Sequence, residues 1–221
     1  MDNRSRARFN DLFDTWAQDY DQAVAGVHPE YREVFAGYHR ILKTVVDALH
    51  LPEGSRVLEI GVGTGNLSAK LLRAGYRVTG VEPSRKMREK AVQKVPGLRV
   101  LDGHFLSLPA LSKVEAAVST YAFHHLTDGE KVRALKEIRR LLLPSGQVVF
   151  ADTAFASEEE KQAMVAEAEQ RGFQELEKDL KREFYPLIPD LERIFEEAGF
   201  SVSLRRLNRY VWLMEAALKS R

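Results

Sequence analysis

The sequence contains no cysteine, which excludes disulfide bonds, thiolate metal sites and cysteine nucleophiles. An excess of either charge is also lacking, because 33 basic and 32 acidic residues leave a formal net charge of +1. A chain this close to neutrality has no general attraction to nucleic acid or to an anionic membrane. No apolar run approaches the ~20 residues that a membrane-spanning helix requires.

The sequence predicts no secretory leader, because residues 2–6 are polar and no apolar core follows them. These absences predict a soluble cytoplasmic protein with no membrane or nucleic-acid partner. The 221 residues, 44% of them hydrophobic, are enough for one sizeable core, and no linker or internal repeat divides them. We therefore expect a single domain over residues 1–221, of unknown oligomeric state.

The first fifty residues show helical spacing. Apolar side chains recur every three or four positions in two groups, at Phe9, Leu12, Phe13, Trp16, Ala17 and Tyr20 and again from Tyr31 to Leu49. Gly26 and Pro29 separate the groups. Residues 1–52 are therefore predicted to form two helices that cap the rest of the domain.

From residue 53 onwards, strand and helix patterns alternate. The predicted strands span residues 56–60, 77–81, 98–101, 115–120 and 147–151, with a turn at 144–146 before the last one. Thr127 and Glu130 form a capping box at the start of the preceding helix. The alternation predicts an α/β fold with a doubly wound, mostly parallel sheet over residues 53–152, whose ligand lies at the carboxyl ends of the strands.

The pattern changes after the fifth strand. A second capping box, Ser157–Glu160, opens a charged and mostly helical insertion over residues 153–188. Residues 189–221 read as a last helix followed by strand-like segments at 200–207 and 210–218. Too few residues separate these segments for a crossover helix, so we predict an antiparallel hairpin.

The most informative segment is a strand end and loop at residues 57–66, Val-Leu-Glu-Ile-Gly-Val-Gly-Thr-Gly-Asn. Gly61, Gly63 and Gly65 leave the loop almost without side chains, so its backbone can lie against a ligand. A predicted helix follows at once, and its N-terminal N–H groups point into the same space. The segment predicts a site for a ligand with a polar or negatively charged end, with a tight turn without ligand as the alternative.

Polar residues follow the next two strands of the predicted sheet. Glu82 ends the second strand beside the glycine loop, where a carboxylate can accept hydrogen bonds from both hydroxyls of a ribose. Its alternative role is to complement the dipole of the following helix. Residues 102–105, Asp-Gly-His-Phe, place polar groups and a ring where an adenine would lie, or else form a simple turn.

Two details distinguish between nucleoside cofactors. The dinucleotide fingerprint is Gly-x-Gly-x-x-Gly, whereas Gly65 follows Gly61 by four positions and Asn66 takes the fifth. Glu59, two residues before the first glycine, suits the ammonium group of an amino acid better than a diphosphate. The segment therefore points towards S-adenosylmethionine, with an NAD-dependent oxidoreductase as the alternative.

With these motifs the chain resembles the class I S-adenosylmethionine-dependent methyltransferases, and among them the YrrT-like group of small bacterial methyltransferases of unassigned substrate. The resemblance rests on Val57–Asn66, Val81–Ser84, Tyr121–Leu126 and Tyr210–Leu218. It implies a Rossmann-like sheet of seven strands, in which the last hairpin places one antiparallel strand. This agrees with the hairpin predicted from the loop length.

The resemblance also implies roles for single residues. Glu59 and the three loop glycines would bind the methionine portion of the cofactor, and Glu82 would bind the ribose. Ser119 and Tyr121, at the end of the fourth strand, would contribute backbone groups to the methionine end.

The adenine site departs from the family pattern. The family usually has an acid directly after Gly103, and this chain has His104 there. Asp102 could substitute by a local shift, or a neutral His104 could accept the hydrogen bond from the adenine amino group. The sequence leaves both open.

Methyl transfer from a sulfonium depends mainly on aligning nucleophile, methyl and sulfur. A base is needed only where the acceptor must lose a proton. His124 and His125, just after the fourth strand, are the candidates, and shaping that loop is their alternative role. Asp152, which ends the fifth strand, is a candidate for the acceptor pocket.

Two segments are candidates for covering the site. Tyr20 is expected either to close over the cofactor or to pack in the core, where we also place Trp16. Residues 153–188, with Tyr185, are a candidate lid over the acceptor, with a solvated charged helix as the alternative.

Further absences narrow the acceptor. No Asn/Asp-Pro-Pro-Tyr run follows the fourth strand, which disfavours methylation of DNA bases, and no cysteine is present to attack a pyrimidine. No basic stripe with interleaved aromatic residues predicts an RNA groove, because the cluster of Arg205, Arg206 and Arg209 reads as a solvated strand face. We expect a small-molecule acceptor and no metal site. The alternatives are a protein or structured RNA acceptor, and a cofactor-binding sensor or scaffold without turnover.

Overall fold

The computed structural model describes residues 20–219, apart from the side chain of Tyr20. The expected first helix, with Trp16, lies outside this range except for its end, which is α2, Tyr20–Val24. The expected closure of Tyr20 over the cofactor falls on a side chain outside the described part and stays a prediction.

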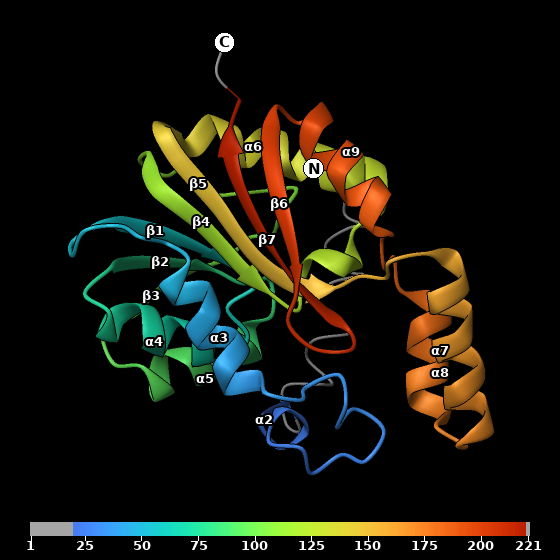
Figure 1. Ribbon diagram of the computed structural model, residues 1–221. Helices are drawn as coiled ribbons and strands as arrows, with labels where there is room; N and C mark the ends of the chain where they lie inside the picture. Colours follow the sequence, from blue (N-terminus) through green and yellow to red (C-terminus); the bar gives the residue numbers. More distant parts are fainter. Residues whose placement is uncertain (1–19, 220–221) are drawn as a thin grey trace.

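Within residues 20–219, a seven-stranded sheet forms the centre of the molecule (Figure 1). Its strands are β1 Arg56–Ile60, β2 Arg77–Val81, β3 Arg99–Leu101, β4 Val114–Thr120, β5 Leu142–Thr153, β6 Phe200–Arg206 and β7 Val211–Leu218. Their order is β3-β2-β1-β4-β5-β7-β6. Strand β7 is antiparallel to both β5 and β6, and the other neighbours are parallel. The doubly wound fold and its antiparallel C-terminal hairpin are therefore confirmed.

Helices cover both faces of the sheet, and the strands are apolar on both sides for that reason. These helices are α3 Tyr38–Asp47, α4 Asn66–Arg73 and α5 Arg85–Lys94 on one face, and α6 Asp128–Leu141 and α9 Ile188–Glu197 on the other. Neighbouring residues of β4 alternate between the two cores, since Ala116 packs on the α3 side and Ala117 on the α6 side.

The second N-terminal helix is shorter than its apolar spacing predicts. Helix α3 begins only at Tyr38, because Gly37 has a φ of 73° and interrupts the helical backbone. Residues 29–37 form turns instead. Tyr31 and Phe35 are nevertheless buried. Their spacing therefore indicates burial correctly, but not a continuous helix.

Strand β5 is longer than predicted. It begins at Leu142, and the expected turn at 144–146 is an irregularity within it. The pairing with β4 jumps there from Leu142, opposite Val114, to Gln147, opposite Ala116. The extra residues are absorbed as a bulge, which a sequence pattern cannot separate from a turn.

One of the two expected capping boxes forms completely. Thr127 and Glu130 bond reciprocally at the start of α6. Ser157 accepts the N–H of Glu160, but the Glu160 carboxylate turns to the N–H of Ala156 and not to that of Ser157. The second box is therefore only half formed.

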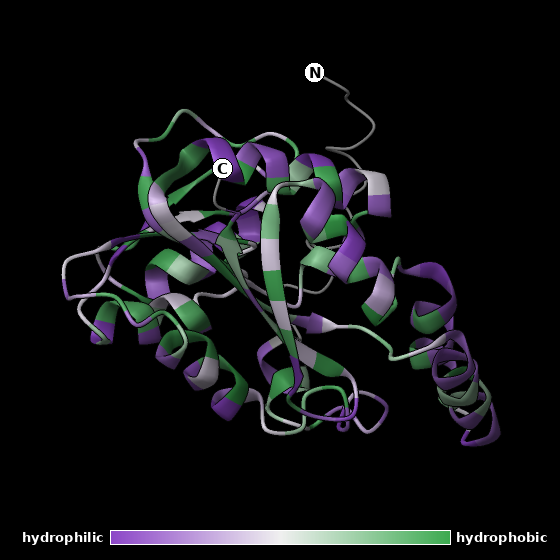
Figure 2. Cartoon of the chain, turned by 45° about the horizontal axis from the view of Figure 1, so that its top comes forward, coloured by the Kyte–Doolittle hydropathy of each residue, from purple (hydrophilic) through white to green (hydrophobic). Residues whose placement is uncertain are grey.

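The insertion forms a pair of helices, α7 Glu158–Gln170 and α8 Gln174–Arg182, which stands beside the sheet (Figure 1). The pair is largely hydrophilic (Figure 2). Residues 28–36, which we call the N-terminal segment, fasten it to the domain. The Glu30 carboxylate accepts the first N–H groups of α8, from Glu175 at 2.9 Å and Leu176 at 3.0 Å.

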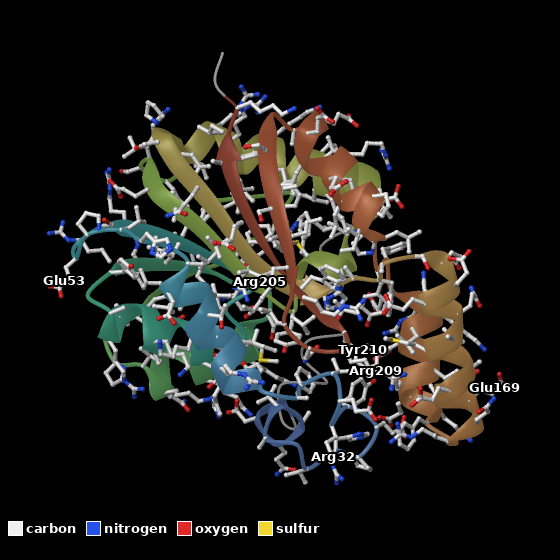
Figure 3. All side chains as sticks on the ribbon, in the orientation of Figure 1. Arg32, Glu53, Glu169, Arg205, Arg209 and Tyr210 are labelled. Atoms are coloured by element: carbon white, nitrogen blue, oxygen red, sulfur yellow. The ribbon has the colours of Figure 1, made fainter. Side chains whose placement is uncertain are left out.

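The basic cluster at the β6–β7 end also takes part in this packing. Arg209 lies 2.8 Å from Glu33 of the N-terminal segment and 2.5 Å from Glu167 of α7 (Figure 3). Arg206 pairs with Glu160 at 2.7 Å. These two arginines remain exposed to solvent, as expected, and also join segments together. No helix in residues 20–219 has the length and apolar character needed to cross a membrane.

Candidate active site

A cavity opens at the carboxyl ends of β1, β2 and β4, where the strand order reverses between β1 and β4. In doubly wound sheets this is the position at which ligands bind. Its lining residues come from the glycine loop, the ends of β2, β3 and β4, the N-terminal segment and the end of α8: Tyr31, Phe35, Ile60, Gly61, Gly63, Glu82, Pro83, Met87, His104, Phe105, Thr120, Tyr121, Ala122, His124, His125, Asp179, Arg182, Glu183 and Tyr185.

The three glycines of the loop differ in what they do. Gly61 has a φ of 76°, and a Cβ added to it would lie 2.7 Å from the Cβ of Ala122. Gly63, with a φ of 56°, has nothing within 4 Å of the same position and lines the cavity. Gly65 lies away from the cavity at the start of α4, where an added Cβ would lie 3.3 Å from the Ala91 Cα of α5. Gly61 therefore allows the loop to pack against Ala122, Gly63 leaves the cavity wall open, and Gly65 allows two helices to pack.

The loop is also tied to α2. The carboxylate of Asp21 accepts a hydrogen bond from the Thr64 hydroxyl at 2.7 Å and from Asn66 at 3.2 Å. Lys94 of α5 contacts the same carboxylate at 2.6 Å. The glycine loop and the start of the described chain are therefore one connected unit.

Glu82 is held rigidly at the cavity wall. Its side chain is only 4% exposed. One carboxylate oxygen accepts the N–H of Ser84 at 2.9 Å, and the other accepts the N–H of Gly63 at 3.0 Å. A carboxylate oxygen can accept more than one hydrogen bond, so this orientation suits the two hydroxyls of a ribose.

Glu59 lies beneath the loop and not on the cavity wall. It is 1% exposed, and the hydroxyl of Ser68 on α4 donates to its carboxyl group. Burial raises the pKa of Glu59 to about 8, and the charge of Glu82 adds to the rise. The group is therefore largely protonated at neutral pH, so its contact with a ligand ammonium stays a prediction.

Ser119 and Tyr121 close the end of β4 in different ways. The Ser119 hydroxyl donates to the carbonyl of Ile60 at 2.7 Å and joins β4 to β1 away from the cavity lining. Tyr121 lines the cavity with a φ of 53°, which is rare for a residue with a side chain. Its hydroxyl is buried and has no hydrogen-bond partner among residues 20–219. Such strained positions cluster at functional sites.

The structure separates the two candidates for the adenine site. Asp102 contacts Arg88 of α5 at 3.0 Å and does not line the cavity. His104 lines it, and its Nδ1 accepts the N–H of Leu106 at 3.3 Å. An imidazole that accepts at Nδ1 can carry a proton only on Nε2, and the role of His104 toward an adenine stays a prediction.

His124 belongs to a buried ion pair. It lies in the short 3₁₀ helix η1, Phe123–His125, and its Nδ1 lies 2.6 Å from the Asp152 carboxylate. Burial alone would lower the pKa of His124, but the charge and hydrogen bond of Asp152 raise it. Burial likewise opposes ionisation of Asp152, yet His124 and the backbone N–H groups lower its pKa. Both shifts favour the charged form of the pair, an imidazolium facing a carboxylate.

Asp152 also builds the loop that carries both histidines. Its second oxygen accepts the backbone N–H groups of Ala122, Phe123 and His124 at 3.0, 2.6 and 3.2 Å. Its carboxylate is therefore used within the protein, and the expectation that it faces the acceptor pocket is wrong.

His125 differs from its neighbour. Its Nδ1 lies 2.8 Å from the Glu183 carboxylate at the end of α8. Burial, with the charge of His124, lowers the pKa of His125 to about 4. Burial opposes ionisation of Glu183, but His125 and Arg182 lower its pKa to about 2. An ionised carboxylate can only accept, so the neutral His125 carries its proton on Nδ1.

The cavity is completed by Tyr185, which was expected as part of the lid, and by three residues that the sequence did not single out, Tyr31, Asp179 and Arg182. The Tyr31 hydroxyl donates to Asp179 of α8 at 2.5 Å, and Arg182 contacts Asp179 at 3.1 Å and Glu183 at 2.9 Å. Tyr185 stacks on His124 with ring centroids 4.9 Å apart. The only sequence signal for this group was the aromatic Tyr185 within the insertion, because the partners are distant along the chain.

The fold and this site together define a Rossmann-like, S-adenosylmethionine-dependent methyltransferase, and comparison with known proteins agrees. Residues 57–146 match the methyltransferase domain family. The chain is 50% identical over 209 residues to an uncharacterized methyltransferase of Anoxybacillus flavithermus, covering 94% of this chain and 97% of the relative. A second such protein, from Geobacillus kaustophilus, is 50% identical over 210 residues, covering 94% and 96%. The chain belongs to this methyltransferase family.

A solved structure shows the same architecture with a cofactor product in place. Magnesium protoporphyrin IX methyltransferase from Synechocystis, determined with bound SAH, superposes with a TM-score of 0.74. The identity is 19%, and the match covers 95% of this chain and 98% of that one. The enzyme class inferred from the sequence, with its S-adenosylmethionine cofactor, is confirmed by the family to which the chain belongs, whereas this structure confirms the fold. The NAD-dependent alternative therefore loses its support.

Proposed function

We propose that this enzyme transfers the methyl group of S-adenosylmethionine by in-line displacement to a small-molecule acceptor. The observation that carries the proposal is the single cavity that runs from Gly63 and Glu82 to a chamber beside His125. The N-terminal segment and α8 supply the far wall of that chamber through Tyr31 and Glu183. A chamber walled in this way favours a small molecule over a nucleic acid or a protein surface.

The cofactor assignments follow the cavity wall. Gly61 and Gly63 would lie against the methionine portion, and Glu82 would accept the ribose hydroxyls. His104, as a donor, fits a ring nitrogen of adenine better than its amino group. Glu59, Gly65 and Ser119 would act from beneath this surface by supporting the loop.

His125 is the better candidate for a general base, and His124 for a structural role. A base must be unprotonated before the reaction, which the low pKa of His125 supports. Asp152 raises the pKa of His124, which disfavours the unprotonated ring that a base requires. A base beside the chamber would stand on the acceptor side of the transferred methyl, as alignment requires.

The division of the domain follows the same proposal. Residues 1–52 would form a cap, residues 53–152 the cofactor-binding core, and residues 189–221 the last helix and hairpin. Residues 153–188 would act as a lid, which the contacts of α8 with the N-terminal segment support. A cytoplasmic location stays a prediction.

Incubation of the protein with methyl-labelled S-adenosylmethionine and pools of metabolites, protein or RNA tests the proposal. We expect label in the metabolite pool and binding of the cofactor in isothermal titration. No cofactor binding up to millimolar concentration would contradict the whole assignment. Label found only in protein or RNA would contradict the small-molecule acceptor, and binding without transfer to any pool would favour a sensor or scaffold.

A further inference from the structure

The insertion lines the cavity with Asp179, Arg182, Glu183 and Tyr185, and Glu183, which directly follows α8, is the one that pairs with His125. Two backbone contacts hold it there. The N–H of Phe184 donates to the carbonyl of His124 at 3.1 Å. The carbonyl of Phe184 accepts from the ammonium of Lys131, a fully buried residue of α6, at 2.7 Å. The position of the Glu183 carboxylate is thus set by the same loop that carries the two histidines.

The charge of Glu183 determines the direction of the hydrogen bond between Glu183 and His125. Arg182 donates to one carboxylate oxygen, and His125 faces the other at 2.8 Å. Because the carboxylate is ionised, Nδ1 of His125 must donate. An isolated neutral histidine can carry its proton on either nitrogen, so the carboxylate selects one of two forms.

We propose that Glu183 is a positioning residue for catalysis: it holds His125 in the tautomer whose Nε2 can take a proton from the methyl acceptor. This inference rests on the function proposed above. The acceptor gives its proton to Nε2 and attacks the methyl carbon. The carbon–sulfur bond breaks with its electron pair going to sulfur, and the products are the methylated acceptor, S-adenosylhomocysteine and an imidazolium. Glu183 then faces the new positive charge.

The lid is therefore part of the catalytic apparatus. Glu183 connects through Arg182 and Asp179 to Tyr31 of the N-terminal segment, with contacts of 2.9, 3.1 and 2.5 Å. If α8 moved away, His125 would lose the group that fixes its tautomer. Proton transfer would then be available only when the chamber is closed.

A divalent cation is the other occupant that this cluster suggests. The ligating atoms of His124, His125 and Glu183 lie within 4.8 Å of one another. Two features favour the hydrogen-bonded pair over a cation. Arg182 already contacts Glu183, and Nδ1 of His124 already lies 2.6 Å from the Asp152 carboxylate.

Long-range proton–nitrogen NMR of ¹⁵N-labelled protein tests the inference without an acceptor, because it distinguishes protonated from unprotonated ring nitrogens. The chain has six histidines, so His125→Asn would assign the His125 signal. We expect wild-type His125 at pH 7 to be neutral and protonated at Nδ1. Glu183→Gln should lose that preference, since an amide can also donate to Nδ1. Glu177→Gln, on the same helix but paired with Lys181, is the matched control.

Wild-type His125 protonated at Nε2, or an unchanged spectrum in Glu183→Gln, would overturn the inference. Displacement of the Nδ1 proton by micromolar Zn²⁺ would overturn it in favour of a cation site. Where Glu183→Gln does not fold, Glu183→Asp shortens the carboxylate by one methylene and should also lose the tautomer. With an identified acceptor, turnover of Glu183→Gln should fall of order 10²-fold. Titration with S-adenosylhomocysteine tests the proposed function separately. If the wild-type protein did not bind this ligand, the proposed function would be contradicted, whereas the tautomer result would still hold.

Discussion

Replacing Glu82 by alanine should weaken cofactor binding in a protein that still folds. The carboxylate is fixed by the N–H groups of Gly63 and Ser84, so it meets the ribose without first losing side-chain freedom. A charge-assisted hydrogen bond contributes about 1.5–3 kcal/mol. In the variant, water replaces part of the hydrogen bonding to the ribose. We therefore expect the binding free energy to weaken by about 2–3 kcal/mol, or the Kd to rise roughly 30–150-fold.

The same substitution has a smaller effect on stability. The two N–H groups lose their acceptor, at about 0.5–1.5 kcal/mol each, and water can reach them from the cavity. Melting should therefore fall by only a few degrees, at about 2–4 °C per kcal/mol for a chain of this size.

Isothermal titration with S-adenosylhomocysteine, at a temperature where the variant is folded, measures the first effect. Glu89→Ala is the matched control, because Glu89 contacts only the exposed Arg85 among the pairs described on α5. Unchanged affinity in a folded Glu82→Ala protein would refute the ribose assignment. A similar loss in Glu89→Ala would show that the effect is not specific to the cavity wall.

Three further outcomes are expected. Gly61→Ala should lower the free energy of urea unfolding by more than Gly63→Ala does. At both positions an alanine in the left-handed backbone costs about 1–2 kcal/mol, but only an alanine at 61 would also approach Ala122 closely. Equal losses in the two variants would show that this close approach is easily relieved. The pKa of Glu59 is raised from its ordinary 4.5 to about 8, so the folded state keeps a proton that the unfolded chain releases, and stability should fall as the pH rises from about 4.5 to 8 and then level off. Urea unfolding of Glu59→Gln should show less of this fall, and a wild type equally stable across that window would contradict a buried protonated carboxyl. On an identified acceptor, His125→Ala should lose roughly 10²–10⁴-fold in turnover while keeping its cofactor affinity, whereas His124→Ala should mainly lose about 3–5 kcal/mol of stability by leaving Asp152 buried without its partner; full turnover in His125→Ala would rule out the base.

The parts of the site that could be predicted are those encoded locally. The glycine loop and Glu82 are each set by a strand end and the helix after it, and they meet because β1 and β2 are parallel neighbours. The antiparallel hairpin followed from the short connection between β6 and β7. Periodicity was less informative near residues 29–37, where burial against the core occurs without a helix.

The parts that could not be predicted depend on partners far along the chain. His124 and His125 are adjacent and identical, yet Asp152 raises the pKa of His124, whereas burial and the charge of His124 lower that of His125 in spite of its pair with Glu183. Both partners lie on other elements. The protonation of Glu59 likewise depends on how deeply α4 buries it, which no local pattern records.

The tie between Asp21 and the glycine loop has a consequence for the rate of turnover. The start of the described chain contacts Thr64 and Lys94 near the cofactor, and the N-terminal segment that follows contacts α8 over the acceptor. Ligand exchange at either end would therefore break contacts made by this one stretch of chain. The exposed ion pair among these contacts, Asp21–Lys94, is weak, at about 0.2–1 kcal/mol, and is screened by salt. If exchange limits the rate, the enzyme should turn over faster as ionic strength rises.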